Sequence, residues 1–256
     1  MQNAALAELG LAGEWSYEAI EVAPGEFESL VRSLPERDFA GVNVTVPHKQ
    51  AALAVADSAS PAARAIGAAN TLSFAAGQIA AENTDAPALI AALPVPPAGL
   101  RALVLGAGGA GRACAWALRE AGAEVSVWNR TARRGAELAT ELEIAHSEEP
   151  GEFDLLVNAT TVGMREPGVD GAAAEAPDLK QLPVRADALN ERKVVVDLVY
   201  GPVPTPLVEA ARSRGARVVD GLEVLVHQGA ASLRTWTGLD PPVETMRAAV
   251  LKAGRD

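Results

Sequence analysis

A short glycine-rich segment between an apolar run and a helical pattern constrains most strongly how this chain can fold. Residues 106–111 read Gly-Ala-Gly-Gly-Ala-Gly, which matches G-x-G-x-x-G. Alone the hexapeptide is weak evidence, but here it follows an apolar strand pattern and opens a helical one. Glycines at such a turn let the backbone approach a pyrophosphate, which the free N–H groups of the helix start can bind. We therefore favour a dinucleotide-binding βαβ unit over a mere tight strand-to-helix turn.

The pattern around this turn is a regular alternation of strands and helices. Helices are expected at about 109–121, up to about 142 and after Pro206. Strands are expected at 101–105, 124–128, 154–157, 194–197 and 217–219. Alternation at this spacing is typical of a parallel sheet with helices on both faces. We expect a doubly wound, Rossmann-like dinucleotide-binding domain over residues 98–221.

The first part of the chain has a different pattern and ends at a stiff segment. Strands are expected at 15–22, 41–46 and 69–74, and helices at 4–11, around 27–34 and from about Lys49 and Asp85. The run Pro94-Val95-Pro96-Pro97-Ala98-Gly99 cannot continue a helix, so it is the best domain boundary. We expect an N-terminal α/β domain over residues 1–93, joined by the C-terminal helices of residues 222–256.

The residues after the second Rossmann strand indicate which dinucleotide binds. An NAD site usually has an acid there, which bonds the ribose 2′-hydroxyl. This chain instead has Trp128-Asn129-Arg130-Thr131, followed by Arg133 and Arg134. Cations at a helix start oppose the helix dipole and so need another reason. Arg130 and Arg134 can pair with a 2′-phosphate as bidentate donors, which favours NADP.

Composition excludes several classes of function. The formal net charge of −11 argues against non-specific nucleic-acid binding and against attraction to anionic lipid. No apolar run approaches the roughly 20 residues of a membrane span. The single cysteine, Cys114, cannot form an internal disulfide, which fits a reducing cytoplasm. His48, His146 and His227 lack cysteines or acids at ligand spacing, so we expect no metal site.

Eight motifs, taken in order, resemble those of the shikimate dehydrogenase family. They are NVTVPHK, GAANT, ENTDA, GAGGAGRA, NRTARR, NATTVGM, DLVYGPVPTPL and HQGAASLRTWTG. Each motif is modest evidence, but eight in family order along nearly the whole chain are specific. The resemblance implies a substrate domain and a dinucleotide domain with a cleft between them. It also implies the NADPH-dependent reduction of 3-dehydroshikimate to shikimate in the route to aromatic amino acids, with these small molecules as the partners of a monomer or homodimer.

The same resemblance assigns roles to individual residues. It makes Lys49 and Asp85 the catalytic pair. The implied substrate contacts are Thr45, Asn70, Tyr200 and Gln228. The implied cofactor contacts are Gly106, Ala107, Gly108, Gly109, Ala110, Asn129, Arg130, Thr131 and Arg134, with Thr160, Thr161, Val162, Leu198 and Gly221 along the nicotinamide half.

Physical chemistry supports these roles independently. Hydride reduction of a ketone leaves negative charge on oxygen, which needs a proton donor within hydrogen-bond reach. A lysine beside an aspartate can supply that proton, while Thr45, Asn70 and Gln228 offer neutral groups to a polyhydroxylated ring. The alternatives are purely structural roles: a β-favouring strand residue for Thr45, a turn former for Asn70 and a helix cap for Asp85. His48 should point away from Lys49 in an extended segment, so we interpret it as a bystander.

One part of the family pattern is absent from this sequence. The family begins with a strand and a Ser-x-Ser-Pro stretch that binds the substrate carboxylate, before the segment that is Met1-Gln2-Asn3-Ala4-Ala5 here. We expect its loss to expose two sheet edges and to remove charge-assisted hydrogen bonds. A misplaced start codon, a truncation or a real variant with impaired activity would each explain it. Our hypothesis is the first, because the downstream motifs are intact, and in-frame codons upstream of Met1 would test it.

Two other functions remain open at this point. One is a quinate/shikimate dehydrogenase that uses NAD, against which the arginines after Trp128 speak. The other is a paralogue that binds NADP without turnover. The missing N-terminal segment favours that second alternative, whereas the intact Lys49 and Asp85 argue against it.

Overall fold

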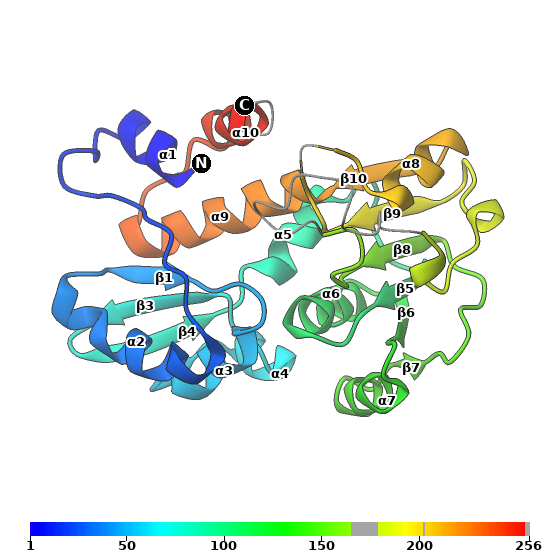
Figure 1. Cartoon of the computed structure of the whole chain (residues 1–256), viewed down its shortest axis with the longest axis horizontal. Helices are drawn as coiled ribbons and strands as arrows, with labels where there is room; N and C mark the ends of the chain where they lie inside the picture. The colour runs from blue at the N-terminus through cyan, green and yellow to red at the C-terminus, as the bar shows by residue number, and fades with distance from the viewer. Residues whose placement is uncertain (165–178, 202, 254–256) are drawn as a thin grey trace. The chain divides into compact units, whose positions relative to one another are not determined.

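The structure is a computed structural model that describes residues 1–164, 179–201 and 203–253 (Figure 1). The chain divides into two compact units. The first unit combines Met1–Ala91 with Val224–Asp256, and the second unit is Ala92–Glu223. The first unit is therefore built from both ends of the chain.

A six-stranded parallel sheet forms the centre of the second unit. Its strand order is β10-β9-β8-β5-β6-β7. The strands are β5 (Arg101–Leu105), β6 (Glu124–Trp128), β7 (Ala145–His146), β8 (Leu155–Asn158), β9 (Val194–Asp197) and β10 (Arg217–Asp220). The helices are α6 (Gly109–Glu120), α7 (Ala132–Glu141) and α8 (Pro206–Ser213), with short 3-10 turns at Leu179–Gln181 and Ala186–Ala188. The expected Rossmann-like parallel sheet is confirmed, and the short strand β7 is an addition that the sequence did not predict.

The chain builds this sheet outward in both directions from β5. It runs through β6 to β7 on one side and through β8 and β9 to β10 on the other. Right-handed crossovers then place α6 and α8 on opposite faces. The switch in strand order between β5 and β8 is where such folds bind ligands, at the carboxyl ends of the strands.

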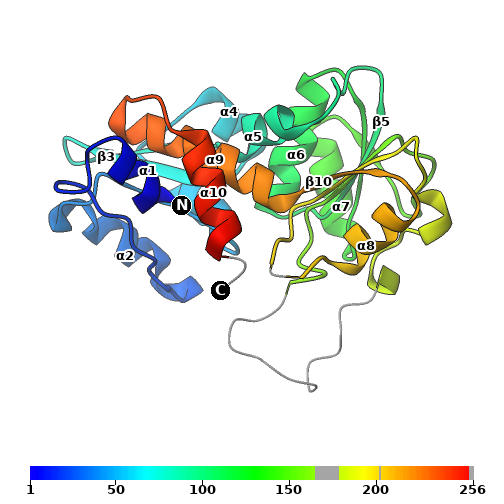
Figure 2. The same ribbon diagram turned by 90° about the horizontal axis from the view of Figure 1, so that it is seen from above.

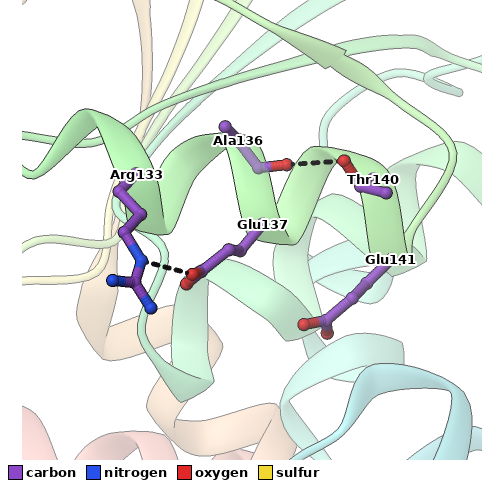
Figure 3. A pocket seen from close by; sticks show the side chains of 5 residues that line it. All are labelled: Arg133, Ala136, Glu137, Thr140 and Glu141. Atoms are coloured by element: carbon purple, nitrogen blue, oxygen red, sulfur yellow. Dashed lines mark hydrogen bonds and ion pairs between the residues drawn. The ribbon is translucent and has the colours of Figure 1, made fainter.

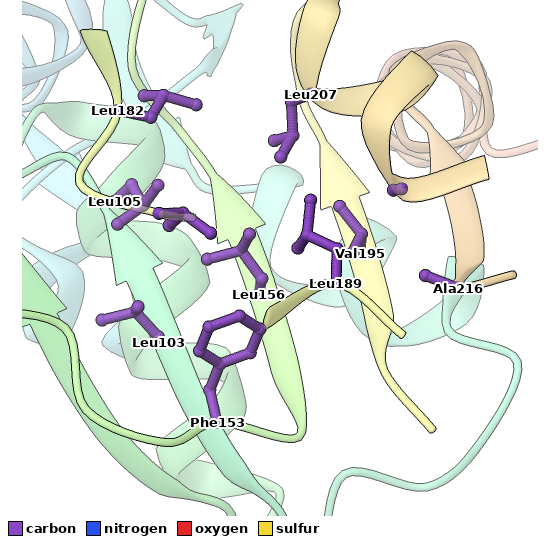
Figure 4. Packing of buried hydrophobic residues seen from close by; sticks show 11 residues of the cluster. Leu103, Leu105, Phe153, Leu156, Leu182, Leu189, Val195, Leu207 and Ala216 are labelled. Carbon is purple, nitrogen blue, oxygen red and sulfur yellow. The ribbon is translucent and has the colours of Figure 1, made fainter. Parts of the chain in front are cut away.

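The core of the second unit lies between the central strands and α8 (Figure 4). Leu105, Leu156 and Val195 come from three neighbouring strands, and Leu207 reaches them from α8. All four residues of β8 and of β9 are buried. Strands covered on both faces need continuous apolar runs, which explains why the sequence predicted them well.

A four-stranded mixed sheet belongs to the first unit. Its order is β1-β3-β4-β2, in which β3 is antiparallel to β1 and β4, while β2 is parallel to β4. The strands are β1 (Gly41–Asn43), β2 (Ser58–Ala59), β3 (Thr71–Ala75) and β4 (Gln78–Glu82). The helices are α1 (Gln2–Glu8), α2 (Phe27–Ser33), α3 (Lys49–Val55), α4 (Pro61–Ile66), α5 (Asp85–Ala92), α9 (Gly221–Thr237) and α10 (Val243–Ala253), with 3-10 turns at Pro24–Glu26 and Pro35–Arg37.

Helices from the two ends of the chain pack side by side in the first unit, as both views of the ribbon show for α1 and α10 (Figures 1 and 2). Leu6 of α1, Leu233 of α9 and Met246 of α10 share one buried cluster. This packing makes the C-terminal helices part of the same core as the N-terminal residues.

Two strand predictions in the first unit were wrong in detail. Residues 15–22 are not a strand, because in the described part of the chain they have no ladder partner and are attached instead through side chains. The strand expected over 41–46 ends at Asn43. Beyond it the N–H of Val44 donates to the carbonyl of Asn70, and the chain turns toward α3. Strands β2 and β4 and helix α4 were missed.

Candidate active site

Lys49 and Asp85 form a close ion pair in the first unit. Lys49 Nζ lies 2.6 Å from Asp85 Oδ2, although 36 residues separate them. Lys49 is the first residue of α3, and Asp85 is the first residue of α5. Their side chains are only 13% and 10% exposed, so each charge is largely removed from water and depends on the other. A helix start favours the aspartate and disfavours the lysine, which makes an ordinary solvated lysine a poor description of Lys49.

Asn70 holds the other oxygen of the Asp85 carboxylate. Asn70 Nδ2 donates to Asp85 Oδ1 at 2.9 Å. The amide orientation is fixed because Asn70 Oδ1 accepts the N–H of Thr84 at 2.7 Å. Both carboxylate oxygens are therefore engaged, one by Lys49 and one by Asn70. This arrangement holds Asp85 as an acceptor facing the lysine ammonium.

Gln228 joins the same group from α9. Its Oε1 accepts from Asn70 Nδ2 at 3.2 Å, and its Nε2 donates to the carbonyl of Leu225 at 2.9 Å. The exposed Thr45 lies in the turn that leads into α3. The structure thus brings Lys49, Asp85, Asn70 and Gln228 into one hydrogen-bonded chain. Tyr200 belongs to the second unit, where it follows β9 and is exposed.

His48 packs away into the core of the first unit. Its ring stacks on Phe27 at 4.6 Å between centroids, and the side chain is buried. Nε2 lies 3.1 Å from the carbonyl oxygen of Val22, to which it must donate because a carbonyl only accepts. These contacts give His48 a structural role in anchoring the 15–22 segment.

The glycine-rich loop of the second unit contains close backbone approaches at two glycines and open space at a third. Gly106 has φ +110°, and a Cβ there would lie 2.8 Å from the Ala159 carbonyl oxygen. A Cβ on Gly111 would lie 2.0 Å from the Gly106 oxygen, so neither position accepts a larger residue. A Cβ on Gly108, by contrast, would meet nothing within 4 Å. The open space beside Gly108, at the start of α6, fits a phosphate group.

Asn129 links this loop to the next strand. Its Oδ1 accepts the N–H of Ala107 at 3.1 Å, and its Nδ2 donates to the carbonyl of Thr131 at 2.9 Å. The Asn129 amide therefore fixes the glycine-rich loop against the segment that carries the arginines. These are the side-chain hydrogen bonds that Asn129 makes with the described residues.

The three arginines after β6 differ in their partners. Arg133 pairs with Glu137 one turn along α7 at 2.7 Å (Figure 3). In the described part of the chain, Arg130 and Arg134 are exposed and form no ion pair. Two unpaired guanidinium groups in a protein of net charge −11 are available to an anion.

The loops after β8 and β9 are joined by a buried carboxylate that the sequence analysis did not single out. Asn158 ends β8 and lies directly opposite Asp197, the last residue of β9. Asn158 Nδ2 donates to Asp197 Oδ1 at 2.9 Å, and Thr205 Oγ1 donates to Asp197 Oδ2 at 2.5 Å. Burial raises the pKa of the Asp197 carboxyl above its usual range, although these hydrogen bonds oppose the shift.

This carboxylate network holds the predicted nicotinamide-side residues in place. The N–H and hydroxyl of Thr160 both donate to Asn158 Oδ1, and Val162 N–H donates to Thr160 Oγ1. A Cβ on Gly221 would lie 2.7 Å from the Asp197 carbonyl oxygen, so that helix start also approaches closely. Thr161 and Leu198 lie in the same two loops. Asn158 and Asp197 could have been recognised in the sequence, because each is a polar residue at the end of an apolar strand.

Two other kinds of site have no candidate among the described residues. No group of three or more His, Cys, Asp and Glu side chains lies close enough there to hold a metal ion. None of the helices in that part of the chain has the length and apolar character of a membrane span.

The chain is similar to proteins of one family along nearly its whole length. Three family models match: Shikimate dehydrogenase substrate binding domain at residues 1–72, Shikimate / quinate 5-dehydrogenase at 95–160, and Shikimate 5'-dehydrogenase C-terminal domain at 221–251. Shikimate dehydrogenase (NADP(+)) from a strain of Thermus thermophilus is 45% identical over 99% of this chain and 92% of its own length.

Solved structures agree with these matches. The crystal structure of Shikimate 5-dehydrogenase from Thermus thermophilus in complex with NADP(H) and shikimate has a TM-score of 0.85 at 42% identity, covering 98% of this chain and 92% of that one. Quinate dehydrogenase from Corynebacterium glutamicum in complex with NAD has a TM-score of 0.78 at 28% identity, covering 98% of this chain and 92% of that one.

Proposed function

Because this chain belongs to the shikimate dehydrogenase family, we propose that it catalyses the reversible NADPH-dependent reduction of 3-dehydroshikimate to shikimate in aromatic amino acid biosynthesis. The observation that carries the proposal is the Lys49–Asp85 pair, closed at 2.6 Å and largely shielded from water. It is the arrangement that a carbonyl reduction needs beside its reacting oxygen.

The pair supplies the proton, and NADPH when bound supplies the hydride. As the carbonyl carbon is reduced, negative charge develops on its oxygen, and the Lys49 ammonium can stabilise and protonate it. Asp85 keeps that ammonium oriented through Oδ2, while Asn70 keeps Asp85 oriented through Oδ1. In the direction of shikimate oxidation, Lys49 takes the hydroxyl proton back.

Neutral side chains around the pair suit a ring with several hydroxyl groups. Asn70 and Gln228 each carry an amide, with one donor group and one acceptor, close to the lysine. Thr45 adds an exposed hydroxyl at the turn before Lys49. We propose these three residues as substrate contacts of the first unit, and Tyr200 as a contact contributed by the second.

The second unit fits NADP by its chemistry. The open space beside Gly108 and the start of α6 suit the pyrophosphate, and the unpaired Arg130 and Arg134 suit a 2′-phosphate. We propose that the residues from Gly106 to Ala110 and from Asn129 to Thr131 line this part of the site. The loops that hold Thr160, Thr161, Val162 and Leu198, together with Gly221, would lie along the nicotinamide half.

Replacement of the lysine tests the proposed function. In Lys49→Ala, shikimate-dependent reduction of NADP should fall by about 10²–10⁴-fold, the usual worth of a general acid–base group. Binding of NADP, measured by calorimetry, should be unchanged because its proposed contacts lie in the other unit. If the variant retains more than a few per cent of wild-type turnover, Lys49 is not the proton carrier.

A second candidate is the dehydrogenation of quinate with NAD, favoured by the likeness to the Corynebacterium glutamicum enzyme. The unpaired Arg130 and Arg134 argue against it, since NAD carries no 2′-phosphate. A higher kcat/KM with NAD and quinate than with NADP and shikimate would establish this candidate instead.

Location and assembly are further proposals. The chain has a single cysteine, Cys114, which is buried and cannot form a disulfide within the chain, so we propose that the enzyme works in a reducing cytoplasm. We propose a monomer or a homodimer, which size-exclusion chromatography with light scattering would distinguish.

A further inference from the structure

We propose that Ser232 of α9 is a positioning residue, which sets the orientation of Asn70 and Gln228 beside the catalytic pair. The inference rests on the proposed function for its kinetic consequence. Its structural part stands on the contacts of Ser232 alone, and the experiment below keeps the two apart.

Ser232 is the centre of a buried polar cluster. Its side chain is fully buried. Its Oγ lies 2.7 Å from Asn43 Nδ2, 2.8 Å from Thr71 Oγ1, 3.2 Å from Thr84 Oγ1 and 3.0 Å from the Gln228 carbonyl oxygen. We call Ser232, Asn43, Thr71 and Thr84 the serine cluster. It joins α9 to β1, to β3 and to the start of α5.

The directions of these hydrogen bonds follow from counting protons. A serine hydroxyl has one proton and two acceptor lone pairs. The Gln228 carbonyl can only accept, so Ser232 donates its proton there. Towards Asn43 Nδ2, which can only donate, Ser232 accepts. Its remaining lone pair accepts a hydroxyl proton from Thr71 or Thr84. Ser232 is therefore an acceptor that Asn43 shares with one of the two threonines.

The role of Ser232 as an acceptor determines which hydroxyl protons are donated to Asn70. Outside their own pair, the hydroxyl protons of Thr71 and Thr84 have two acceptors in reach, Ser232 Oγ and Asn70 Oδ1. Asn70 Oδ1 already accepts the backbone N–H of Thr84. Without Ser232, one threonine hydroxyl can still donate to the other at 3.2 Å, and Asn70 Oδ1 is then the acceptor in reach for the remaining hydroxyl proton. The Asn70 amide would then be pulled from the position in which its Nδ2 faces the catalytic carboxylate.

Ser232 also fixes the helix turn that carries Gln228. Its hydroxyl binds the Gln228 carbonyl one turn back along α9, while its lone pairs hold Asn43 and the threonines of the sheet. The turn between Gln228 and Ser232 is therefore attached to the sheet through polar contacts as well as packing. Gln228 presents its Oε1 to Asn70 from this attached turn.

The same helix offers a matched control. Thr237 Oγ1 donates to the Leu233 carbonyl at 2.8 Å, the same contact one turn back that Ser232 makes. Its hydroxyl oxygen also accepts the N–H of Leu239, near the end of the helix. Thr237 therefore shares the local helix contact of Ser232 but not the serine cluster.

Kinetic analysis of Ser232→Ala, Ser232→Cys and Thr237→Ala tests the proposal. Cysteine fills the space of serine but is a weak hydrogen-bonding group. Both Ser232 variants should lose about tenfold or more in kcat/KM for shikimate, since the buried donors would lose a shared acceptor and displace the Asn70 amide. The KM for NADP should stay at the wild-type value, and Thr237→Ala should match the wild type throughout. Wild-type kinetics in Ser232→Cys would mean that Ser232 only fills space, which overturns the proposal.

A measurement without turnover separates this proposal from the proposed function. In ¹⁵N NMR spectra, the side-chain amide protons of Asn70 should exchange slowly with solvent in the wild type and in Thr237→Ala. They should exchange faster in Ser232→Cys, which keeps the volume needed for folding if Ser232→Ala does not fold. Unchanged exchange in Ser232→Cys overturns the positioning role. An inactive wild type would overturn the proposed function and leave the positioning role intact.

Discussion

At the residue scale, the three arginines at positions 130, 133 and 134 differ in whether they are available to bind a ligand. Arg133 is occupied by Glu137, whereas Arg130 and Arg134 form no ion pair among the described residues. Charge-assisted hydrogen bonds to a phosphate are the strong class, and an occupied arginine must first give up its partner. Arg130 and Arg134 are therefore the candidates for selecting NADP over NAD.

This difference gives a prediction with an internal control. Arg130→Ala and Arg134→Ala should each reduce kcat/KM for NADP by about tenfold or more, given the usual worth of a hydrogen bond to a charged group. The kcat/KM for NAD should hardly change, because NAD lacks the 2′-phosphate. Arg133→Ala should keep the wild-type preference. Equal losses with both coenzymes would mean that these arginines stabilise the fold and do not select the coenzyme.

The sequence named candidate site residues but not the contacts that orient them. Lys49, Asp85, Asn70 and Gln228 were named from their motifs, and the structure joins them by hydrogen bonds, one of which spans 158 positions of the chain. Ser232 was not named, because a serine within a helix has no local signal for a buried role. Its partners come from distant elements and exist only once the fold has formed.

At the element scale, the first turn of α6 shows which glycines the fold requires. The fold requires glycine where a Cβ would collide with backbone atoms. A Cβ at position 111 would lie 2.0 Å from a backbone oxygen, while one at position 108 would meet open space. The two glycines of one motif therefore serve different purposes. Gly111 allows the helix to pack on the turn, and Gly108 faces open space that the proposed coenzyme would occupy.

Alanine substitutions separate these purposes. Gly111→Ala should lower the melting temperature markedly, because backbone must shift to admit the methyl group. Gly108→Ala should fold with nearly wild-type stability but bind NADP more weakly, since the methyl group occupies the proposed pyrophosphate space. Thermal denaturation and calorimetric titration with NADP measure both effects. Wild-type NADP affinity in a folded Gly108→Ala would show that the pyrophosphate does not bind there.

Elements that were predicted well differ physically from those that were missed. The central strands β5, β8 and β9 of the parallel sheet are buried on both faces, so their apolar runs are visible in the sequence. Strand β2 has two residues and exists through its pairing with β4, which no local pattern contains. The 15–22 segment has a strand-like pattern, yet in the described part of the chain it lacks the ladder partner that would make it one.

The stability of the whole molecule should depend on pH through the amino ends of β5 and β8. The Arg101 guanidinium donates to both carboxylate oxygens of Asp154 at 3.0 Å. These hydrogen bonds are the main reason that the pKa of Asp154 falls from 3.8 to about 2. A depressed carboxyl pKa contributes stability above the unfolded-state value, and that contribution disappears as pH falls towards the folded-state value.

Comparison of Asp154→Asn with the wild type isolates this contribution. The variant should have a lower free energy of unfolding at neutral pH, and the difference should shrink as pH falls from about 4 to about 2. The raised pKa of Asp197 has the opposite effect, because its protonation favours the folded state, but it is common to both proteins and cancels. Urea unfolding at a series of pH values gives the difference. A difference that stays constant down to about pH 2 would contradict the assigned role.

At the scale of the whole molecule, the two compact units carry different parts of the proposed site. The motifs of the proposed catalytic pair and of the proposed coenzyme loop lie on either side of the proline-rich segment at 94–99. The structure assigns those motifs to different compact units, and most of the two C-terminal helices belong to the first, as the sequence analysis expected. Packing of α9 and α10 against α1 accounts for this membership.

The most direct test of the central claim is the initial rate of NADP reduction when the purified wild-type chain is mixed with shikimate. We predict a saturable, shikimate-dependent rate, with kcat/KM higher for NADP and shikimate than for NAD or quinate. Binding of NADP without any shikimate-dependent reduction would contradict the claim that this chain is an NADP-dependent shikimate dehydrogenase.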